Sequence, residues 1–458
     1  MLAPRLAGRK ITVVGLAKSG VAAARLCLRE GARVTVTDRR DAAALGPALA
    51  ALDGARRVLG GHDLADFEGA DLVVVSPGVP LANPELRAAR AGGVEVIGEV
   101  ELAARFLGET PIVGVTGTNG KSTTTALAGA LFARHRPTFT GGNLGTPLCE
   151  HVLSGARAEV VVAELSSFQL EGIDRLRARV AAILNVTPDH LDRYRDVEDY
   201  ALAKARLFAR QQPGDVAVAN ARDPRALAMA GASRGERHTF GFGPPAAGAT
   251  RDAGPEAGPA ELSFTPAGGA PEPYRLQNRA LRGRHNRENA MAAIACARLL
   301  GVPPAVVQAG LEAFPGLPHR LELVSERGGV EWVNDSKATN VDSTSVGLAA
   351  FPAGAPRVVI VMGGRGKGAP YAPLRPLFEG RVKALLTIGE DAPAVERELG
   401  DLTPTEPCGT LAEAVRRGAR LAGKGDVVLL SPACASYDQF ESYERRGEAF
   451  RRLVAELP

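Results

Sequence analysis

Residues 112–123, Ile-Val-Gly-Val-Thr-Gly-Thr-Asn-Gly-Lys-Ser-Thr, decide the fold of the middle of the chain. The apolar run Ile112–Val115 predicts a buried strand, and Ser122–Phe132 predicts a helix that follows a glycine-rich turn. Such a turn binds phosphate, because glycines let backbone N–H groups approach phosphate oxygens and the helix N-terminus carries a partial positive charge. Lys121 is placed to bridge the outer phosphates and Ser122 to hold Mg²⁺. The stretch therefore predicts a nucleotide site.

Val115 makes this loop a variant, because the commonest phosphate loop has a glycine at that position. The alternative is a chance Gly-Lys-Ser turn. The apolar runs Val160–Glu164 and Ala181–Asn185 continue the alternation of strand and helix, so they predict a parallel sheet around the loop. Ligands are then expected at the carboxyl ends of its strands.

Two further series of strands and helices flank this one, and 458 residues exceed the size of a single hydrophobic core. We predict an α/β protein of three domains: a Rossmann-like N-terminal domain (1–106), a central phosphate-loop domain (107–317) and a Rossmann-like C-terminal domain (318–458). The strands expected in the outer domains are Lys10–Gly15, Arg33–Thr37, Asp71–Val75, Val330–Asn334, Val358–Met362, Ala384–Ile388 and Val427–Leu430, with a helix at Val21–Glu30. The Gly- and Pro-rich segment Gly241–Pro273 is expected to be a mobile insertion or irregular hairpin.

The composition excludes several classes of protein. A formal net charge of +4 with interspersed charges gives no nucleic-acid-binding surface. No apolar stretch approaches the length of a spanning helix, so we expect a cytoplasmic protein without a membrane partner. The cysteines are odd in number and scattered, which predicts free thiols that each fill a core.

A second nucleotide signal lies near the N-terminus. Gly15–Gly20 opens a helix and can bind pyrophosphate, while Asp38 ends the next strand and suits a ribose or base. This pattern imitates the dinucleotide fingerprint of a nicotinamide-dependent oxidoreductase. However, Ala17 replaces its middle glycine, and such an enzyme has no use for Lys121. A phosphate-loop switch that hydrolyses nucleotide to change partners is the third class considered.

Further motifs, in the same order along the chain, resemble landmarks of the Mur ligase family. The first is the loop Thr-Gly-Thr-Asn-Gly-Lys-Ser-Thr at 116–123. The others are Glu164–Leu170 (Glu-Leu-Ser-Ser-Phe-Gln-Leu), Asn185–His190 (Asn-Val-Thr-Pro-Asp-His), His285-Asn286, Pro318-His319-Arg320, Asn334–Asn340 (Asn-Asp-Ser-Lys-Ala-Thr-Asn) and Ser431–Ser436 (Ser-Pro-Ala-Cys-Ala-Ser). The resemblance covers nearly the whole chain and is far more specific than one loop.

The resemblance implies an ATP- and Mg²⁺-dependent ligase that acts on small-molecule substrates. Its last two motifs, with Tyr437–Phe440, favour the addition of D-glutamate to UDP-N-acetylmuramoyl-L-alanine through an acyl phosphate. Alanine-adding, diaminopimelate-adding and folate-glutamylating relatives share the ATP loop and remain alternatives. We expect a monomer.

The resemblance also implies roles for individual residues. Lys121, Glu164, His190, Lys204 and Lys337 are expected to be catalytic, and Ser122, Glu164, His190 and carbamylated Lys204 to hold Mg²⁺. A carbamate would turn a cation that repels Mg²⁺ into an anionic oxygen ligand. The residues expected at ATP are Gly117, Thr118, Asn119, Gly120, Lys121, Ser122, Thr123, Asn286, Asn289, Arg320 and Asp335.

The other two substrates are expected to bind separate sets of residues. The UDP-sugar set is Lys18, Ser19, Gly20, Asp38, Arg39, Ser76, Gly78 and Asn143, and the D-glutamate set is Thr339, Lys367, Ser436 and Tyr443. Tyr443 stands where the family has Phe. The swap is neutral if the backbone makes the contact and otherwise alters glutamate affinity.

Overall fold

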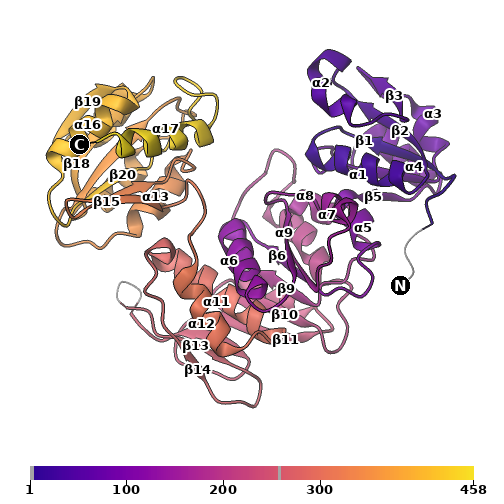
Figure 1. Cartoon of the computed structure of the whole chain (residues 1–458), viewed down its shortest axis with the longest axis horizontal. Helices are drawn as coiled ribbons and strands as arrows, with labels where there is room; N and C mark the ends of the chain where they lie inside the picture. The colour runs from indigo at the N-terminus through magenta and orange to yellow at the C-terminus, as the bar shows by residue number, and fades with distance from the viewer. Residues whose placement is uncertain (1–4, 256–258, 458) are drawn as a thin grey trace. The chain divides into compact units, whose positions relative to one another are not determined.

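The computed structural model describes residues 5–255 and 259–457. It contains three β-sheets, each accompanied by helices (Figure 1). The predicted α/β architecture of three domains is confirmed. Tertiary contacts divide the chain into two compact units. Of the described residues, the first unit contains 5–253, Glu261–Arg275 and Glu288–Leu311, and the second contains 254–255, 259–260, Leu276–Arg287 and 312–457.

The first sheet is fully parallel, with strand order β3-β2-β1-β4-β5. The chain therefore leaves β1 in one direction and returns on its other side as β4, and ligands bind at the crevice created by such a reversal. Its strands are β1 Lys10–Val14, β2 Arg33–Asp38, β3 Arg56–Leu59, β4 Leu72–Val75 and β5 Val96–Gly98. Its helices are α1 Lys18–Arg29, α2 Ala42–Ala50, α3 Leu64–Glu68 and α4 Pro84–Ala91, with α5 Glu99–Ala104 leading out.

The second sheet holds the predicted phosphate loop. Strand β6 (Ile112–Thr116) pairs in parallel with β8 (Val160–Glu164) and β9 (Val180–Ile183), so the carboxyl ends of three buried strands meet beside the loop. Three further parallel strands are β7 Thr138–Gly142, β10 Val216–Asn220 and β11 Glu236–Phe242. The helices are α6 Lys121–Ala133, α7 Leu148–Ser154, α8 Ser167–Glu171, α9 Val197–Ala205, α10 Pro224–Gly231, α11 Arg284–Leu299 and α12 Pro304–Ala313.

For the segment Gly241–Pro273, of which residues 256–258 lie outside the described residues, the expectation of an irregular hairpin is confirmed and that of a mobile insertion is wrong. Strand β12 (Ala249–Asp252) pairs in parallel with β11, and β13 (Leu262–Thr265) and β14 (Glu272–Tyr274) follow as antiparallel strands that extend the central sheet. Strands of three or four residues are too short to show a period in sequence, and the Gly- and Pro-rich turns between them dominate the composition.

The third sheet lies in the second unit, with order β15-β16-β20-β17-β18-β19, and only β15 is antiparallel. The order again reverses beside a central strand, β20. Its strands are β15 Glu322–Arg327, β16 Val330–Asn334, β17 Val358–Gly363, β18 Val382–Ile388, β19 Thr405–Gly409 and β20 Val427–Leu430. The helices are α13 Val341–Ala349, α14 Arg375–Phe378, α15 Ala392–Leu399, α16 Leu411–Leu421 and α17 Tyr443–Ala455.

The cysteines are all free, as the sequence predicts. Four of them are buried, and Cys408 on β19, although only partly buried, packs against the apolar core of this sheet. Strand β19 lies at the edge of its sheet, where side chains keep contact with solvent. Within residues 5–255 and 259–457, no helix has both the length and the apolar character needed to cross a membrane.

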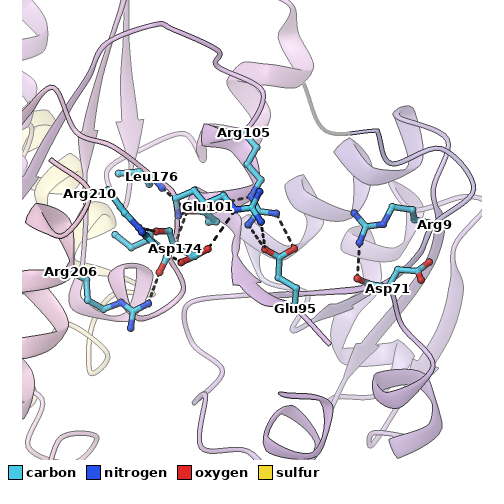
Figure 2. A network of polar contacts seen from close by, with 11 residues as sticks. Arg9, Asp71, Glu95, Glu101, Arg105, Asp174, Leu176, Arg206 and Arg210 are labelled. Atoms are coloured by element: carbon cyan, nitrogen blue, oxygen red, sulfur yellow. Dashed lines mark hydrogen bonds and ion pairs between the residues drawn. The ribbon is translucent and has the colours of Figure 1, made fainter. Parts of the chain in front are cut away.

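The buried carboxylate of Glu101 joins α5 to the loop that precedes β9 (Figure 2). One of its oxygens, Oε2, accepts the backbone N–H groups of Asp174, Arg175 and Leu176 at 2.9–3.0 Å. Its Oε1 accepts a hydrogen bond from Arg105 Nε at 3.0 Å. The same guanidinium forms two hydrogen bonds with Glu95. Glu101 is 0% exposed, and both of its carboxylate oxygens accept hydrogen bonds from these donors.

We expect Glu101→Gln to lower the melting temperature by several degrees. The amide keeps the volume but replaces one acceptor with donors that face other donors, and losing hydrogen bonds to a charged group costs about 1.5–3 kcal/mol. Differential scanning calorimetry of the full chain measures the change. Glu68→Gln, at an exposed position on α3, is the control. Equal melting temperatures for the two variants would contradict a structural role for Glu101.

Candidate functional site

The phosphate loop has the backbone geometry that its glycines permit. Gly120 has φ of 85° and caps α6, and a side chain there would collide with Asn289 Oδ1. Lys121 Nζ donates hydrogen bonds to the carbonyl oxygens of Gly117 (2.9 Å) and Thr118 (2.8 Å). Ser122 and Thr123 occupy the first turn of α6, where N–H groups lack helical partners. The ammonium is therefore held over the loop.

Asn185, which follows β9, fixes the shape of this loop. Its Oδ1 accepts the N–H groups of Thr118 (3.1 Å) and Asn119 (2.8 Å), and its backbone carbonyl accepts the Thr118 N–H as well. Thr187 N–H donates to Thr118 Oγ1 at 3.1 Å. Sequence reasoning included Asn185 in a motif but assigned it no role. A signal was present, because Asn185 is a polar residue that follows a strand paired with β6, and the carboxyl ends of neighbouring parallel strands lie together.

Glu164 ends β8 beside the loop and is 2% exposed. Asn143 Nδ2 donates to its Oε1 at 2.6 Å. Its Oε2 is buried and has no hydrogen-bond partner within the described residues. A buried carboxylate oxygen without a donor suits a cation. No group of three His, Cys, Asp or Glu side chains in the described part of the chain gathers as a metal site, so any ion here must also use hydroxyl, phosphate or water oxygens.

Lys204, on α9, is 1% exposed, and its Nζ donates to the Gly117 carbonyl at 2.9 Å. Burial, followed by the nearby positive charge of Lys121, lowers the pKa of Lys204 to about 7. The ring of Tyr200 lies 4.2 Å from its ammonium. Near neutral pH much of this side chain is therefore a neutral amine, which is nucleophilic.

His190 lies in the turn after β9 in a left-handed backbone conformation, with φ of 54°. Its side chain is 44% exposed, and Nε2 lies 3.6 Å from Asp189 Oδ2. One face of the ring packs against Phe168, with 4.8 Å between ring centres. A non-glycine residue with this φ is uncommon and is concentrated at functional sites.

Two asparagines on α11 were expected near adenine or ribose. Asn289 reaches the loop, since its Oδ1 accepts Thr124 Oγ1 at 3.2 Å and lies against Gly120. Asn286, in the second unit, is buried and donates to the Arg282 carbonyl at 3.0 Å.

The predicted UDP-sugar residues gather around a cavity of about 520 Å³ at the reversal of the first sheet. Of the eight, only Gly20 is absent from its lining. A side chain at Gly20 would collide with the Gly15 carbonyl, so this glycine lets α1 pack against the turn. The lining includes Lys18, Ser19, Asp38, Arg39, Ser76, Gly78 and Asn143.

Asp38 lies at the edge of the cavity, and both of its carboxylate oxygens accept hydrogen bonds. Its Oδ2 accepts the Leu16 N–H at 2.7 Å, and Arg40 forms an ion pair with it at 2.8 Å. The side-chain hydrogen bonds from Arg40 are the main reason that the pKa of Asp38 falls to about 2. Arg40 and His62 also line the cavity, and sequence reasoning missed both. Arg40 directly follows two predicted residues, so the sequence offered a signal for it. His62 lies far from them along the chain, and only the fold brings its side chain to the cavity.

In the second unit, Lys337, which was expected to be catalytic, lies against Tyr443 of the expected glutamate set. Lys337 Nζ donates to Tyr443 Oη at 2.8 Å and lies 4.4 Å from that ring. The glycine-rich turn that carries exposed Lys367 is tied to the loop that carries Ser436, because Arg365 and Ala435 exchange backbone hydrogen bonds. Ser436 is 2% exposed.

Arg320, Asp335 and Thr339 remain predictions as ligand residues. Arg320 and Thr339 are half-buried. Asp335 is held inside the unit, since its oxygens accept the Leu321 N–H (3.2 Å) and Ser431 Oγ (2.9 Å). Burial raises the pKa of Asp335 to about 7.

Arg446 is a buried residue that sequence reasoning missed. It lies on α17 with 1% exposure and donates to Ser336 Oγ at 3.0 Å and to the Cys434 carbonyl at 2.9 Å. Its guanidinium thereby ties the loop that carries Lys337 to the loop that carries Ser436. Desolvation lowers the pKa of Arg446 to about 10.

Comparison with known proteins identifies all three parts of the chain. Residues 9–98 match the MurD-like N-terminal domain of Mur ligases, residues 115–297 match the Mur ligase middle domain, and residues 319–434 match the Mur ligase glutamate ligase domain.

Two relatives match over nearly their full lengths. The UDP-N-acetylmuramoylalanine–D-glutamate ligase of Anaeromyxobacter dehalogenans is 78% identical over 100% of this chain and 99% of its own. The enzyme of the same name from Myxococcus xanthus is 54% identical, with 99% of each chain covered.

Solved structures share the fold. The UDP-N-acetylmuramate-alanine ligase MurC of Thermotoga maritima aligns with a TM-score of 0.59 at 20% identity, covering 98% of each chain. MurF of Acinetobacter baumannii aligns with a TM-score of 0.60 at 21% identity, covering 84% of this chain and 85% of its own. With relatives this similar over its whole length, the chain belongs to the Mur ligase family, whose members are ATP-dependent ligases.

Proposed function

We propose that this chain is the ATP-dependent ligase that joins D-glutamate to the carboxylate of UDP-N-acetylmuramoyl-L-alanine during the synthesis of peptidoglycan precursors. The full-length relatives at 78% and 54% identity carry the name of this activity. A glutamate ligase domain forms the last part of the chain. The predicted domain boundaries, the monomeric state and the cytoplasmic location remain predictions.

One hydrogen bond carries the proposal furthest. Asn143 lines the 520 Å³ cavity and also donates to Glu164 at 2.6 Å, so a single side chain joins the cavity to the carboxyl end of β8. A nucleotide sugar bound in the cavity can therefore extend its far end toward the phosphate loop. That arrangement supports the transfer of a phosphoryl group from ATP to the carboxylate at the far end of the sugar nucleotide.

The reaction needs activation because a carboxylate is a poor acyl donor. A carboxylate oxygen of the substrate attacks the γ-phosphorus of ATP, which releases ADP and leaves an acyl phosphate. The amine of D-glutamate attacks the acyl carbon, and inorganic phosphate and a proton leave as the amide forms. Lys121 would stabilise the negative charge that develops on the transferred phosphoryl group.

The donor set of the site fits Mg²⁺. Glu164 Oε2 is buried without a partner in the described structure, and Ser122 supplies a hydroxyl at the start of α6. These two residues would hold one ion, and His190 with carbamylated Lys204 a second. Bound Mg²⁺ would screen the repulsion between ATP and the substrate carboxylate.

The environment of Lys204 favours its carbamylation. A lysine reacts with CO₂ only as the neutral amine, whose nitrogen bonds to carbon and releases a proton. A pKa of about 7 supplies that neutral form at neutral pH.

In the second unit, Lys337, Thr339, Lys367, Ser436 and Tyr443 would recognise the two carboxylates of D-glutamate and the acyl phosphate. Asn286, Asn289, Arg320 and Asp335 would complete the ATP site.

A phosphate-release assay tests the proposal. Purified protein with ATP, Mg²⁺ and UDP-N-acetylmuramoyl-L-alanine is given D-glutamate, L-glutamate, L-alanine or meso-diaminopimelate separately. Only D-glutamate should elicit stoichiometric phosphate and an amide product detected by mass spectrometry. Release of phosphate with a different amino acid, or without any acceptor, would refute the assignment.

A further inference from the structure

Arg193 joins the edge of the sugar-nucleotide cavity to the turn that holds the phosphate loop. Its Nη1 donates to the Pro77 carbonyl at 3.2 Å. Pro77 lines the cavity between Ser76 and Gly78, and it belongs to the first sheet's part of the unit. Arg193 itself belongs to the central sheet's part. Its side chain is only 13% exposed, so solvent competes weakly for these contacts.

The guanidinium is fixed on two further sides. Glu171 holds it with two hydrogen bonds, at 3.2 Å and 2.7 Å, and itself accepts Tyr194 Oη at 2.5 Å. The Arg193 Cζ lies 4.2 Å from the centre of the Phe168 ring. Planar pairing with a carboxylate together with stacking on an aromatic ring is a task that lysine cannot perform.

From Arg193 the contacts continue to the phosphate loop. The backbone N–H groups of Arg193 and Tyr194 both donate to the His190 carbonyl, at 2.9 Å and 3.0 Å, and Phe168 packs on the His190 ring. The same turn begins with Asn185 and Thr187, whose hydrogen bonds hold Thr118 and Asn119. An unbroken series of contacts thus leads from the cavity edge to the loop.

We propose that Arg193 is a positioning residue that couples occupancy of the sugar-nucleotide cavity to nucleotide binding at the phosphate loop. A ligand that moves the Ser76–Gly78 edge changes the acceptor offered to Arg193, and the guanidinium transmits this change to the His190 turn. The inference rests on the proposed function, because the proposed function assigns the sugar nucleotide to the cavity and ATP to the phosphate loop. Coupling of this kind is reciprocal, so each ligand changes the affinity of the other by the same factor.

The experiment measures that factor directly. Isothermal titration calorimetry gives the Kd of Mg·ADP for the full-length protein with and without saturating UDP-N-acetylmuramoyl-L-alanine. We expect the sugar nucleotide to change this Kd by at least about fivefold, the lower end of typical coupling between sites. In Arg193→Lys and Arg193→Met the ratio of the two Kd values should fall close to one.

Two further variants separate coupling from folding. Glu171→Gln leaves Arg193 in place but loosens it, so it should reduce the ratio partially. Arg225→Lys, which changes an exposed arginine paired with Glu198, should keep the wild-type ratio. If Arg193 had a purely structural role, replacing it would raise both Kd values by the same factor and lower the melting temperature. The ratio of the two Kd values would then stay unchanged.

The outcomes are distinct. A wild-type ratio of one, or an unchanged ratio in both Arg193 variants, overturns the inference. Failure of the wild-type protein to bind either ligand would instead refute the proposed function.

Discussion

Replacing Lys121 with methionine should lower kcat by about 10²–10³-fold, the usual cost of removing one donor that stabilises transition-state charge. In the structure the ammonium is held over the loop by the carbonyls of Gly117 and Thr118. Bound ATP offers it phosphate oxygens, which are stronger acceptors for a cation than neutral carbonyls. Because charge grows on the transferred phosphoryl group, the loss should be larger in kcat than in the affinity for ATP.

The measurement is steady-state phosphate release with D-glutamate and the sugar nucleotide, together with the Kd of Mg·ADP. Methionine keeps an unbranched side chain, so the start of α6 should stay intact. Lys424→Met, at an exposed lysine of the second unit, controls for the loss of one positive charge. A kcat within threefold of that control would show that Lys121 does not act on the phosphoryl group.

The strands that sequence reasoning found are those buried on both faces. Val160–Glu164 and Val427–Leu430 match β8 and β20 residue for residue, because nearly continuous apolar runs are typical of strands that helices cover on both faces of a parallel sheet. The missed strands lie mostly toward sheet edges. Strand β3, Arg56–Leu59, contains two arginines and has no buried residue, so nothing in its composition distinguishes it from a loop. Its strand conformation depends on pairing with β2.

The candidate site divides in the same way between local and tertiary signals. Phosphate-loop residues and Glu164 are visible in sequence because a loop between a strand and a helix, or a carboxylate at a strand end, has a local reason to exist. Arg446 has none: an arginine on an amphipathic helix is normally solvated, and only the fold shows it buried against carbonyl groups. Lys204 depends on both kinds of signal. The family resemblance predicted its role from the sequence, whereas only its burial in the fold lowers its pKa.

Lys204→Met should lower kcat by at least about 10²-fold and yet leave the protein as stable as before, or more so, near neutral pH. The activity falls because methionine cannot become an anionic oxygen ligand. The expected stability of the variant follows from the pKa of Lys204 in the wild-type protein. Folding lowers the pKa of Lys204 to about 7, whereas an exposed lysine has a value of about 10.4. Burying the ammonium therefore costs free energy at low pH.

The sign of the pH dependence follows from proton binding. Between about pH 7 and pH 10 the folded state binds fewer protons at this side chain than the unfolded state, so the uncarbamylated wild-type protein should gain stability as the pH rises. Lys204→Met should lack this gain. Chemical denaturation at pH 7 and pH 9.5 in CO₂-free buffer compares the two proteins. Parallel pH dependences would mean that Lys204 is not buried as a neutral amine.

Bicarbonate separates the chemical role of Lys204 from its structural role. Wild-type protein depleted of CO₂ should lose most of its turnover and regain it when bicarbonate is added, because the neutral amine at this position can form a carbamate again. Lys204→Met should remain slow at every bicarbonate concentration. We expect the variant to keep its fold, so unfolding should not account for its low activity. Full turnover in CO₂-free buffer, together with an active variant, would exclude the carbamate and leave Lys204 as a donor to the Gly117 carbonyl alone.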